Sequence, residues 1–250
     1  MPQNFIWYEL TTADKPAAEA FYKAVVGWQM QSFGKGHDYT VLGAGDGNVG
    51  GIGNPPNAWG PPGWYGYVGV DDVDAVAARV TDGGGSIVRA PADIPSVGRI
   101  AVVADPQGVP FMLLRGSVAD AAPPEAFKPG VPGHVGWNEL HTSDWKGAFA
   151  FYSQLFGWRK LDAMDMGPMG TYQLFGLSAE PIGGMMNSPN VPRPSWLFYF
   201  TVDEIEAAHR RVVANGGSVL HGPSEVPGGG WIIQATDPQG VVFAVVGPRK

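Results

Sequence analysis

The chain has 250 residues, 44% of them hydrophobic, which is enough to build the core of one large domain or of two ordinary ones. It contains no cysteine, so disulfides, thiolate nucleophiles and cysteine-ligated metals are excluded. The formal net charge of -7, without a basic stripe, argues against nucleic acid and anionic membranes as partners.

The N-terminal segment has no basic stretch leading into an apolar run, and no segment approaches the roughly 18 apolar residues that span a bilayer. We therefore expect a cytoplasmic protein. Glycine (37 residues) and proline (23 residues) fall between the apolar runs, a pattern that favours many short strands and turns.

The first half of the chain predicts two successive groups of one strand, one helix and several short strands. Alternation predicts the first strand, and an Asp-capped alanine-rich segment that ends at a glycine predicts the first helix. Glycine-bounded apolar runs predict the remaining strands. In chain order the predicted elements are strand 5–11, helix 16–26, strands 39–42 and 49–52, strand 65–70, helix 73–80, and strands 86–89, 99–104 and 109–114.

The second half repeats the first. Shifting the sequence by 130 residues gives 11 identities in the 22 positions from Trp7 to Trp28. From Trp64 onward the shift is 132, and it superposes the two copies of DPQG. We therefore predict a first domain over residues 1–115, a proline- and glycine-rich linker over 116–133, and a second domain over 134–250.

The shared motifs resemble those of the vicinal-oxygen-chelate superfamily of glyoxalases, bleomycin-resistance proteins and extradiol dioxygenases, in particular its tandem two-domain glyoxalase-like members. They are TADKPAAEAFYKAVVGW, TSDWKGAFAFYSQLFGW and the two DPQG turns. The resemblance implies an α+β fold of two tandem glyoxalase-like domains. Four βαβββ modules would form curled eight-stranded sheets around small-molecule pockets.

Metal-dependent members of that superfamily carry ligands on the first and last strands of each module. The resemblance places those positions on residues that cannot supply the usual His and Glu ligands: Trp7, Tyr65, Met112, Trp137, Leu197 and Ala244. We therefore predict no cofactor and no metal of the usual kind.

Two glutamates are the candidate catalytic residues. Alternation places Trp7, Glu9 and Thr11 on one strand face, and the second copy has Glu139 and His141 there. A carboxylate beside a tryptophan in a partly dry cavity can act as a general base or bind a ligand. The alternative is a structural carboxylate tied to backbone donors, to an arginine or to the other copy.

Glu139 and His141 could also supply two ligands to a divalent metal, although no third ligand follows from the spacing. A histidine at the pocket edge or in solvent is the favoured alternative. Other inward-facing side chains could line an apolar cavity, although a closed aromatic core is an equal alternative. The predicted ligand-binding residues are Trp7, Tyr65, Tyr67, Met112, Trp137, His141 and Tyr199.

The leading functional hypothesis is a metal-free, glyoxalase-like protein that binds a small metabolite or antibiotic, as in resistance or sequestration. One alternative is a lyase, isomerase or hydroxylase-like enzyme that uses a pocket glutamate as general base. A metal-dependent glyoxalase or dioxygenase and a protein-interaction module with vestigial pockets are further alternatives. The sequence is compatible with a monomer or a homodimer.

Overall fold

The computed structural model describes residues 3–34, 38–45, 47–53, 60–117, 123–188 and 193–250. Part of the predicted linker, residues 118–122, lies outside the described residues. No helix in the described part of the chain is long and apolar enough to cross a membrane.

The predicted order of strand, helix and short strands recurs four times. In the first copy the elements are β1 (Phe5–Thr11), α1 (Lys15–Val25), β2 (Gln29–Ser32), β3 (Tyr39–Ala44), β4 (Gly47–Gly53), β5 (Gly63–Gly69), α2 (Val73–Asp82), β6 (Ser86–Ile94), β7 (Gly98–Ala104) and β8 (Pro110–Gly116). In the second copy they are β9 (Val135–Thr142), α3 (Trp145–Phe156), β10 (Arg159–Asp165), a 3-10 turn (Gly167–Met169), β11 (Thr171–Gly176), β12 (Gly183–Asn187), β13 (Ser195–Thr201), α4 (Ile205–Ala214), β14 (Ser218–Glu225), β15 (Trp231–Thr236) and β16 (Val242–Gly247).

The strands form two eight-stranded sheets with the same topology. Their orders are β2-β3-β4-β1-β5-β8-β7-β6 and β10-β11-β12-β9-β13-β16-β15-β14, so both sheets are open. Within each module the first strand pairs in parallel with the last, as β1 does with β4 and β9 with β12. The predicted α+β class and the tandem arrangement are confirmed.

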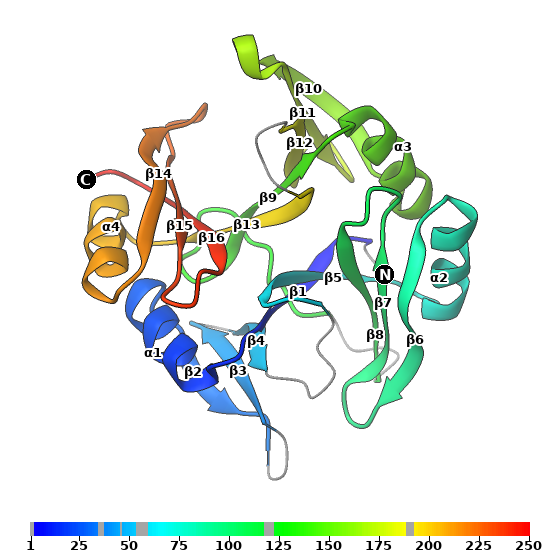
Figure 1. Ribbon diagram of the computed structural model, residues 1–250, viewed down its shortest axis with the longest axis horizontal. Coiled ribbons are helices and arrows are strands. Elements are labelled where there is room, and N and C mark those ends of the chain that lie inside the picture. The colour runs from blue at the N-terminus through cyan, green and yellow to red at the C-terminus, as the bar shows by residue number, and fades with distance from the viewer. Residues whose placement is uncertain (1–2, 35–37, 46, 54–59, 118–122, 189–192) are drawn as a thin grey trace. The chain divides into compact units, whose positions relative to one another are not determined.

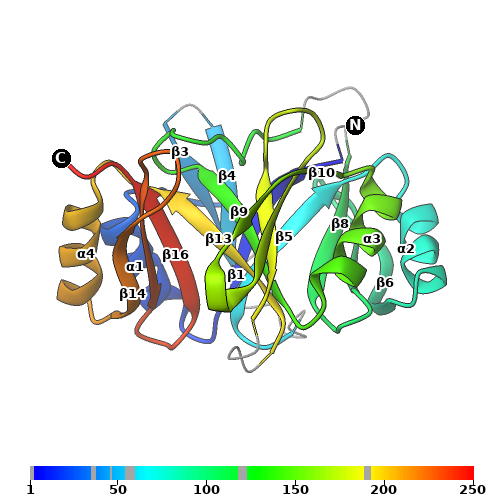
Figure 2. The same ribbon diagram turned by 90° about the horizontal axis from the view of Figure 1, so that it is seen from above.

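The chain also divides into two compact units, and these do not follow the sequence halves. The first unit comprises residues 1–6, 65–123 and 138–196, and the second comprises 7–64, 124–137 and 197–250. Each unit thus joins one module from each copy. Helices α2 and α3 lie side by side in the first unit, and α1 and α4 do so in the second (Figures 1 and 2).

In the first unit, the DPQG turn of one module caps the helix of the other. The Gln107 side-chain oxygen accepts hydrogen bonds from the backbone amides of Ser143 and Asp144, both at 3.0 Å. Its amide nitrogen donates to the Asp144 carbonyl at 3.0 Å. Asp144 in turn caps α3 by accepting from the amides of Lys146 and Gly147. The DPQG turn of one module therefore binds the Thr-Ser-Asp segment (142–144) that begins the helix motif of the other.

Asp105, the aspartate of the same turn, is buried against α3, the helix of the other module. Asp105 accepts from its own turn, through the amides of Gln107 and Val109 at 2.9 Å, and from the Tyr152 hydroxyl at 3.2 Å. The Trp196 indole donates to that hydroxyl at 3.2 Å. A buried carboxylate is costly unless it is hydrogen-bonded, and this arrangement supplies its partners.

The second unit repeats both contacts with the copies exchanged. Gln239 accepts from the Thr12 hydroxyl and the Asp14 amide, each at 2.9 Å, beside the start of α1. The Tyr22 hydroxyl donates to Asp237 at 3.3 Å and accepts from the Trp64 indole at 3.0 Å. These contacts explain why the Thr-x-Asp helix starts, the helix tyrosines, Trp64 with Trp196 and the DPQG turns recur in both copies.

Removing the buried tyrosine hydroxyl should destabilise the first unit. We expect Tyr152→Phe to lower the free energy of unfolding by about 2 kcal/mol, because Asp105 loses a donor and Trp196 loses its acceptor. Urea unfolding followed by circular dichroism measures this change. Tyr22→Phe should behave alike in the second unit, and a change below about 0.5 kcal/mol in both variants would contradict this account.

Asp105 should also make stability depend on pH. Burial raises the pKa of its carboxyl above the ordinary value of 3.8, although its hydrogen bonds act in the opposite direction. The folded chain therefore keeps this proton to higher pH than the unfolded chain. The contribution of Asp105 is complete below pH 3.8 and is lost as the pH rises through the folded-state pKa.

We expect Asp105→Asn to remove that loss, so its free energy of unfolding relative to the native chain should rise just above pH 3.8. Asp74→Asn is the matched control, because the hydrogen bond from Arg99 lowers the pKa of Asp74. The free energy of unfolding of Asp74→Asn, relative to that of the native chain, should fall as the pH rises towards 3.8. Urea titrations across this interval test both slopes, and a flat difference for Asp105→Asn would refute the assignment.

Candidate functional site

The first acid predicted from the sequence, Glu9, is buried on β1 and bonded to a tyrosine on β3. The Tyr39 hydroxyl donates to Glu9 Oε2 at 3.0 Å, and the Trp7 indole nitrogen donates to the same hydroxyl at 2.9 Å. Glu9 is 5% exposed. Trp7, Glu9 and Tyr39 thus form one connected polar group, which we call the Trp7–Tyr39–Glu9 group.

A glycine on the intervening strand makes this group possible. Glu9 lies opposite Gly51 in the parallel pairing of β1 with β4. A Cβ atom at Gly51 would lie 2.1 Å from the Tyr39 hydroxyl oxygen, so the phenol crosses β4 directly above this residue. Only glycine leaves room for the ring.

The tyrosine remains a hydrogen-bond donor. Burial, with a further contribution from the Glu9 carboxylate, raises the pKa of Tyr39 well above its ordinary value of 10.0. The phenol therefore keeps its proton at neutral pH and directs it at the carboxylate.

The second predicted acid, Glu139, is also buried, and its carboxylate faces a histidine. The His141 Nε2 atom lies 2.9 Å from Glu139 Oε2, and His141 Nδ1 lies 2.7 Å from the Ser188 Oγ atom. The ring of Tyr172 covers Gly184 as Tyr39 covers Gly51. The structure therefore brings Glu139 together with His141, as the strand alternation predicts.

Three further predicted ligand-binding residues lie together in the first unit. Tyr65 and Tyr67 are on β5, and Tyr67 pairs with Met112 of β8 in parallel register. All three side chains are buried. Burial raises the pKa of Tyr65 to about 12, so its phenol is neutral.

The last two predicted residues lie in the second unit. Tyr199 belongs to a buried cluster with Leu197 and Ala244, and Trp137 packs against that cluster while remaining partly exposed. The Tyr199 hydroxyl accepts from the Gln234 amide at 2.8 Å. This face of β13, β15 and β16 is thus mainly apolar, with one fixed hydroxyl.

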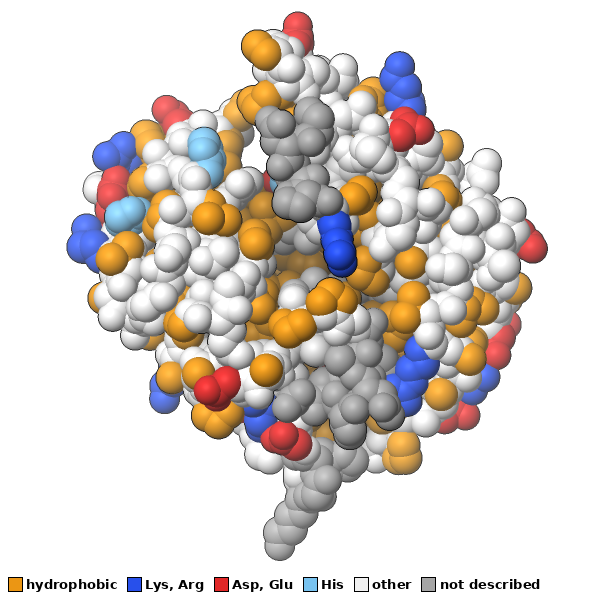
Figure 3. All heavy atoms as spheres, viewed as in Figure 1, with side chains coloured by type: hydrophobic (Ala, Val, Ile, Leu, Met, Phe, Trp, Pro, Cys, Tyr) orange, Lys and Arg blue, Asp and Glu red, His pale blue; other side chains and the backbone are white. Residues whose placement is uncertain are grey.

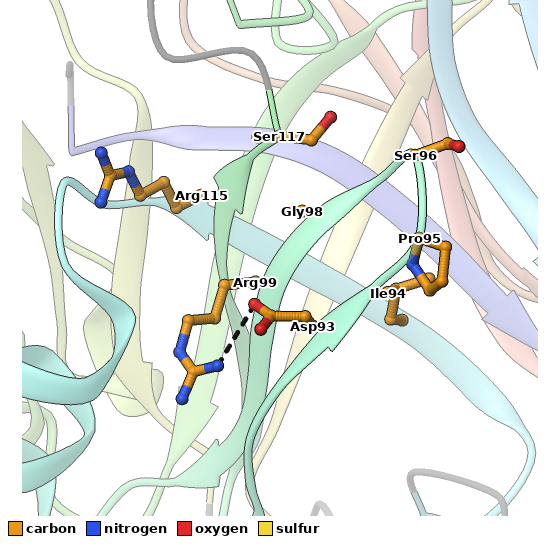
Figure 4. A pocket seen from close by; sticks show the side chains of 9 residues that line it. Asp93, Ile94, Pro95, Ser96, Gly98, Arg99, Arg115 and Ser117 are labelled. Carbon is orange, nitrogen blue, oxygen red and sulfur yellow. Dashed lines mark ion pairs between the residues drawn. The ribbon is translucent and has the colours of Figure 1, made fainter.

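A separate cavity of about 440 Å³ lies where the β6–β7 hairpin meets the end of β8. Figure 4 shows Asp93 and Arg99 directed at each other there, and their Oδ1 and Nη1 atoms are 3.2 Å apart. Arg99 also pairs with Asp74, so its charge is already balanced. None of the residues predicted from the sequence lines this cavity, whose walls are Asp93, Ile94, Pro95, Ser96, Gly98, Arg99, Arg115, Gly116 and Ser117.

Charged side chains on the surface are of mixed sign. Figure 3 shows Lys and Arg side chains scattered among Asp and Glu side chains on the face drawn. The mixture of signs on this face agrees with the absence of a basic stripe in the sequence.

The fold and the shared motifs define a tandem glyoxalase-like protein. The family model of the Glyoxalase/Bleomycin resistance protein/Dioxygenase superfamily matches residues 4–113 and 132–245. The chain belongs to this superfamily, as the resemblance of its motifs predicts.

Two curated relatives extend over nearly the whole chain. The chain is 49% identical over 249 residues to "Putative glyoxylase CFP32" of Mycobacterium tuberculosis, covering 97% of this chain and 94% of the relative. It is 32% identical over 266 residues to "Anthracycline biosynthesis protein DauV" of Streptomyces sp. (strain C5), with coverages of 98% and 93%.

Solved structures show the same fold at low identity. A Mn(II)-bound glyoxalase from Novosphingobium aromaticivorans superposes with a TM-score of 0.65 at 18% identity, covering 98% of this chain and 81% of the other. A catechol 2,3-dioxygenase superposes with a TM-score of 0.67 at 15% identity, with coverages of 99% and 93%. At these identities the likeness concerns the fold alone.

The residues at the family's metal positions do not fit a metal ion. Trp7 uses its indole as a donor, and Met112, Leu197 and Ala244 belong to the apolar interior. Glu139 and His141 are directed at each other. Among the described residues no three or more His, Asp or Glu side chains are grouped so that they could hold a metal ion.

Sequence reasoning missed Tyr39, Tyr172 and Ser188. A signal for the tyrosines was present, because a shift of 133 residues superposes Tyr39 on Tyr172 and Gly51 on Gly184. A tyrosine and a glycine that recur together on neighbouring strands indicate a ring lying over a strand. No comparable signal marks Ser188.

Crowding Tyr39 should disrupt the Trp7–Tyr39–Glu9 group. We expect Gly51→Ala to destabilise the chain by about 2–3 kcal/mol, because the new methyl group displaces the phenol and leaves Glu9 buried without that donor. Gly43→Ala on neighbouring β3 is the matched control, since its Cβ would meet no atom closer than 3.5 Å. Thermal and urea unfolding compare the two, and equal losses would exclude the steric explanation.

Proposed function

We propose that this chain binds a small, partly aromatic or amphipathic molecule without a metal ion. The Trp7–Tyr39–Glu9 group is the observation on which the proposal depends. It places an indole, a neutral phenol and a carboxylate together on one sheet. Such a set offers an aromatic face and directed polar groups, the usual composition of a small-molecule site.

A buried hydroxyl on the same strand supports a ligand here. Thr11 lies two residues beyond Glu9 and is 2% exposed. Its Oγ1 atom has no hydrogen-bond partner among the described residues. A buried polar atom of this kind is costly unless a water or a ligand satisfies it, so a ligand oxygen would gain at this position.

The cluster of Leu197, Tyr199 and Ala244 offers a second surface that combines apolar side chains with a tyrosine hydroxyl. Trp137, Ile232 and Val246 are partly exposed against the cluster of Tyr199 and Leu197, all within the second unit. Partly exposed apolar groups around a fixed tyrosine hydroxyl favour a planar, hydroxylated ligand.

The names of the relatives suggest the class of molecule. One relative is named for anthracycline biosynthesis and another as a glyoxylase. We therefore propose a polycyclic aromatic compound with hydroxyl or carbonyl groups, held for sequestration or resistance. Elemental analysis of the purified chain tests the metal-free part, and a stoichiometric divalent metal retained through gel filtration would refute it.

Binding can be measured with a dihydroxyanthraquinone as probe. We expect a dissociation constant in the micromolar range and stabilisation of about 2.7 kcal/mol at a hundredfold excess over that constant. Quenching of tryptophan fluorescence and thermal unfolding measure the two quantities.

Trp7→Phe and Glu9→Gln should each weaken binding about tenfold, because the first removes the indole donor and the second replaces the carboxylate by a neutral amide, a weaker hydrogen-bond acceptor. Trp231→Phe is the matched control, since its indole lies against Arg249 at 4.3 Å. Equal affinity of all four proteins for the probe would contradict the assigned site.

A further inference from the structure

We propose that Ser188, His141 and Glu139 form a nucleophilic site that hydrolyses carboxylic esters. Ser188 Oγ lies 2.7 Å from His141 Nδ1, and His141 Nε2 lies 2.9 Å from Glu139 Oε2. A hydroxyl, an imidazole and a carboxylate in this order are the components of a serine nucleophile, its general base and the group that orients the base. All three belong to the first unit, and the site is separate from the Trp7–Tyr39–Glu9 group.

The hydrogen-bond donors and acceptors fix the direction of the chain of contacts. An ionised carboxylate only accepts hydrogen bonds, so the proton on this side of the ring belongs to His141 Nε2. In the neutral imidazole, Nδ1 then carries the lone pair. Ser188 must donate its hydroxyl proton to that lone pair, which is the polarity that activates a serine.

The sheet register holds the three groups in place. Residues Glu139 and His141 are two apart on β9, so they share one face of the strand. His141 pairs with Met186 of β12 in parallel register, and the Ser188 amide donates to the Thr142 carbonyl at 2.9 Å. Ser188 therefore follows the end of β12, two residues beyond the strand partner of His141.

Burial increases from Ser188 through His141 to Glu139, which is the order that a serine nucleophile with a buried orienting carboxylate needs. Ser188 is half-buried and so can meet a substrate. The His141 and Glu139 side chains are 15% and 9% exposed. Exclusion of water strengthens the histidine–carboxylate contact, because water competes less for both groups.

The reaction is balanced without a cofactor. The Ser188 oxygen attacks the ester carbonyl carbon while its proton moves to His141 Nδ1. The bond to the leaving oxygen then breaks, and that oxygen takes the proton from His141. Water, activated by the same nitrogen, cleaves the acyl-serine and releases the carboxylic acid and free Ser188.

The backbone restricts which esters should react. The Ser188 amide is already engaged with Thr142, so it does not stabilise a developing oxyanion. We therefore expect slow turnover, and only of activated esters such as nitrophenyl acetate. Ser188 and His141 are the catalytic residues, and Glu139 is a positioning residue.

The first copy offers a natural comparison. Thr11 occupies the position of His141, and a shift of 133 residues places Pro55, which lies outside the described residues, on Ser188. The first copy thus lacks both the base and the nucleophile, so a single acylated serine per chain is expected.

The test is covalent labelling of the full chain with an alkyl fluorophosphonate, in which the serine oxygen displaces fluoride at phosphorus. Peptide mass spectrometry should place one label per chain on Ser188. Ser188→Ala should lose it, and His141→Gln should slow labelling about a hundredfold, the usual contribution of a general base. Ser178→Ala, which removes an exposed serine, is the matched control and should label normally.

Hydrolysis of nitrophenyl acetate tests whether Glu139 acts as a positioning residue for His141. Glu139→Gln replaces the carboxylate by a neutral amide that no longer stabilises the protonated His141 ring, so kcat should fall about a hundredfold while KM and the unfolding temperature remain nearly unchanged. Glu139→Asp should restore part of kcat. Absence of labelling at Ser188 in the folded native chain, or labelling that survives His141→Gln unchanged, would overturn the proposal. Neither outcome bears on anthraquinone binding at Trp7 and Glu9.

Discussion

The buried hydrogen bond between a turn aspartate and a helix tyrosine is the constraint on which each unit depends. Asp105 accepts from Tyr152 in the first unit, and Asp237 accepts from Tyr22 in the second. A buried carboxylate loses its hydration, so every donor around it must be supplied by the chain. The turn, the helix start and the indole that donates to the tyrosine are therefore positioned together, and they fix the strands that carry the candidate sites.

On this common frame the two copies carry different chemistry. Each has a glutamate on its first strand and a tyrosine ring lying over a glycine of the parallel neighbour. In the first copy the tyrosine joins Trp7 to Glu9, the group that we propose to hold a ligand. In the second copy His141 and Ser188 extend from Glu139 towards the surface. Of the three positions Trp7, Glu9 and Thr11, only the last differs between the copies, where the second copy has His141.

The fold could be predicted from the sequence because its signals are local and occur twice. Alternation along β1 and the aspartate cap of α1 each depend on a few neighbouring residues, and both recur in the second copy. The predicted first strand agrees with β1 over Phe5–Thr11. Alternation groups Trp7 with Glu9 and Glu139 with His141 on one strand face, but Tyr39 lies on β3 and Ser188 follows the end of β12. The contact of Glu9 with Tyr39 depends on the register of β1 with β4 and of β4 with β3. The contact of His141 with Ser188 depends on the register of β9 with β12. No local sequence pattern encodes these registers.

The exchange of modules between the copies has a consequence for how such a chain could have arisen. Each cap joins a turn from one copy to a helix from the other, as Gln107 joins Asp144 and Gln239 joins Asp14. A solitary copy would keep the aspartate cap of its helix but would lack the glutamine that binds the backbone just before that helix, and two such copies would supply this contact to each other by reciprocal pairing. A twofold dimer of a half-length ancestor therefore already contains every contact of this type, and gene fusion needed to add only a tether.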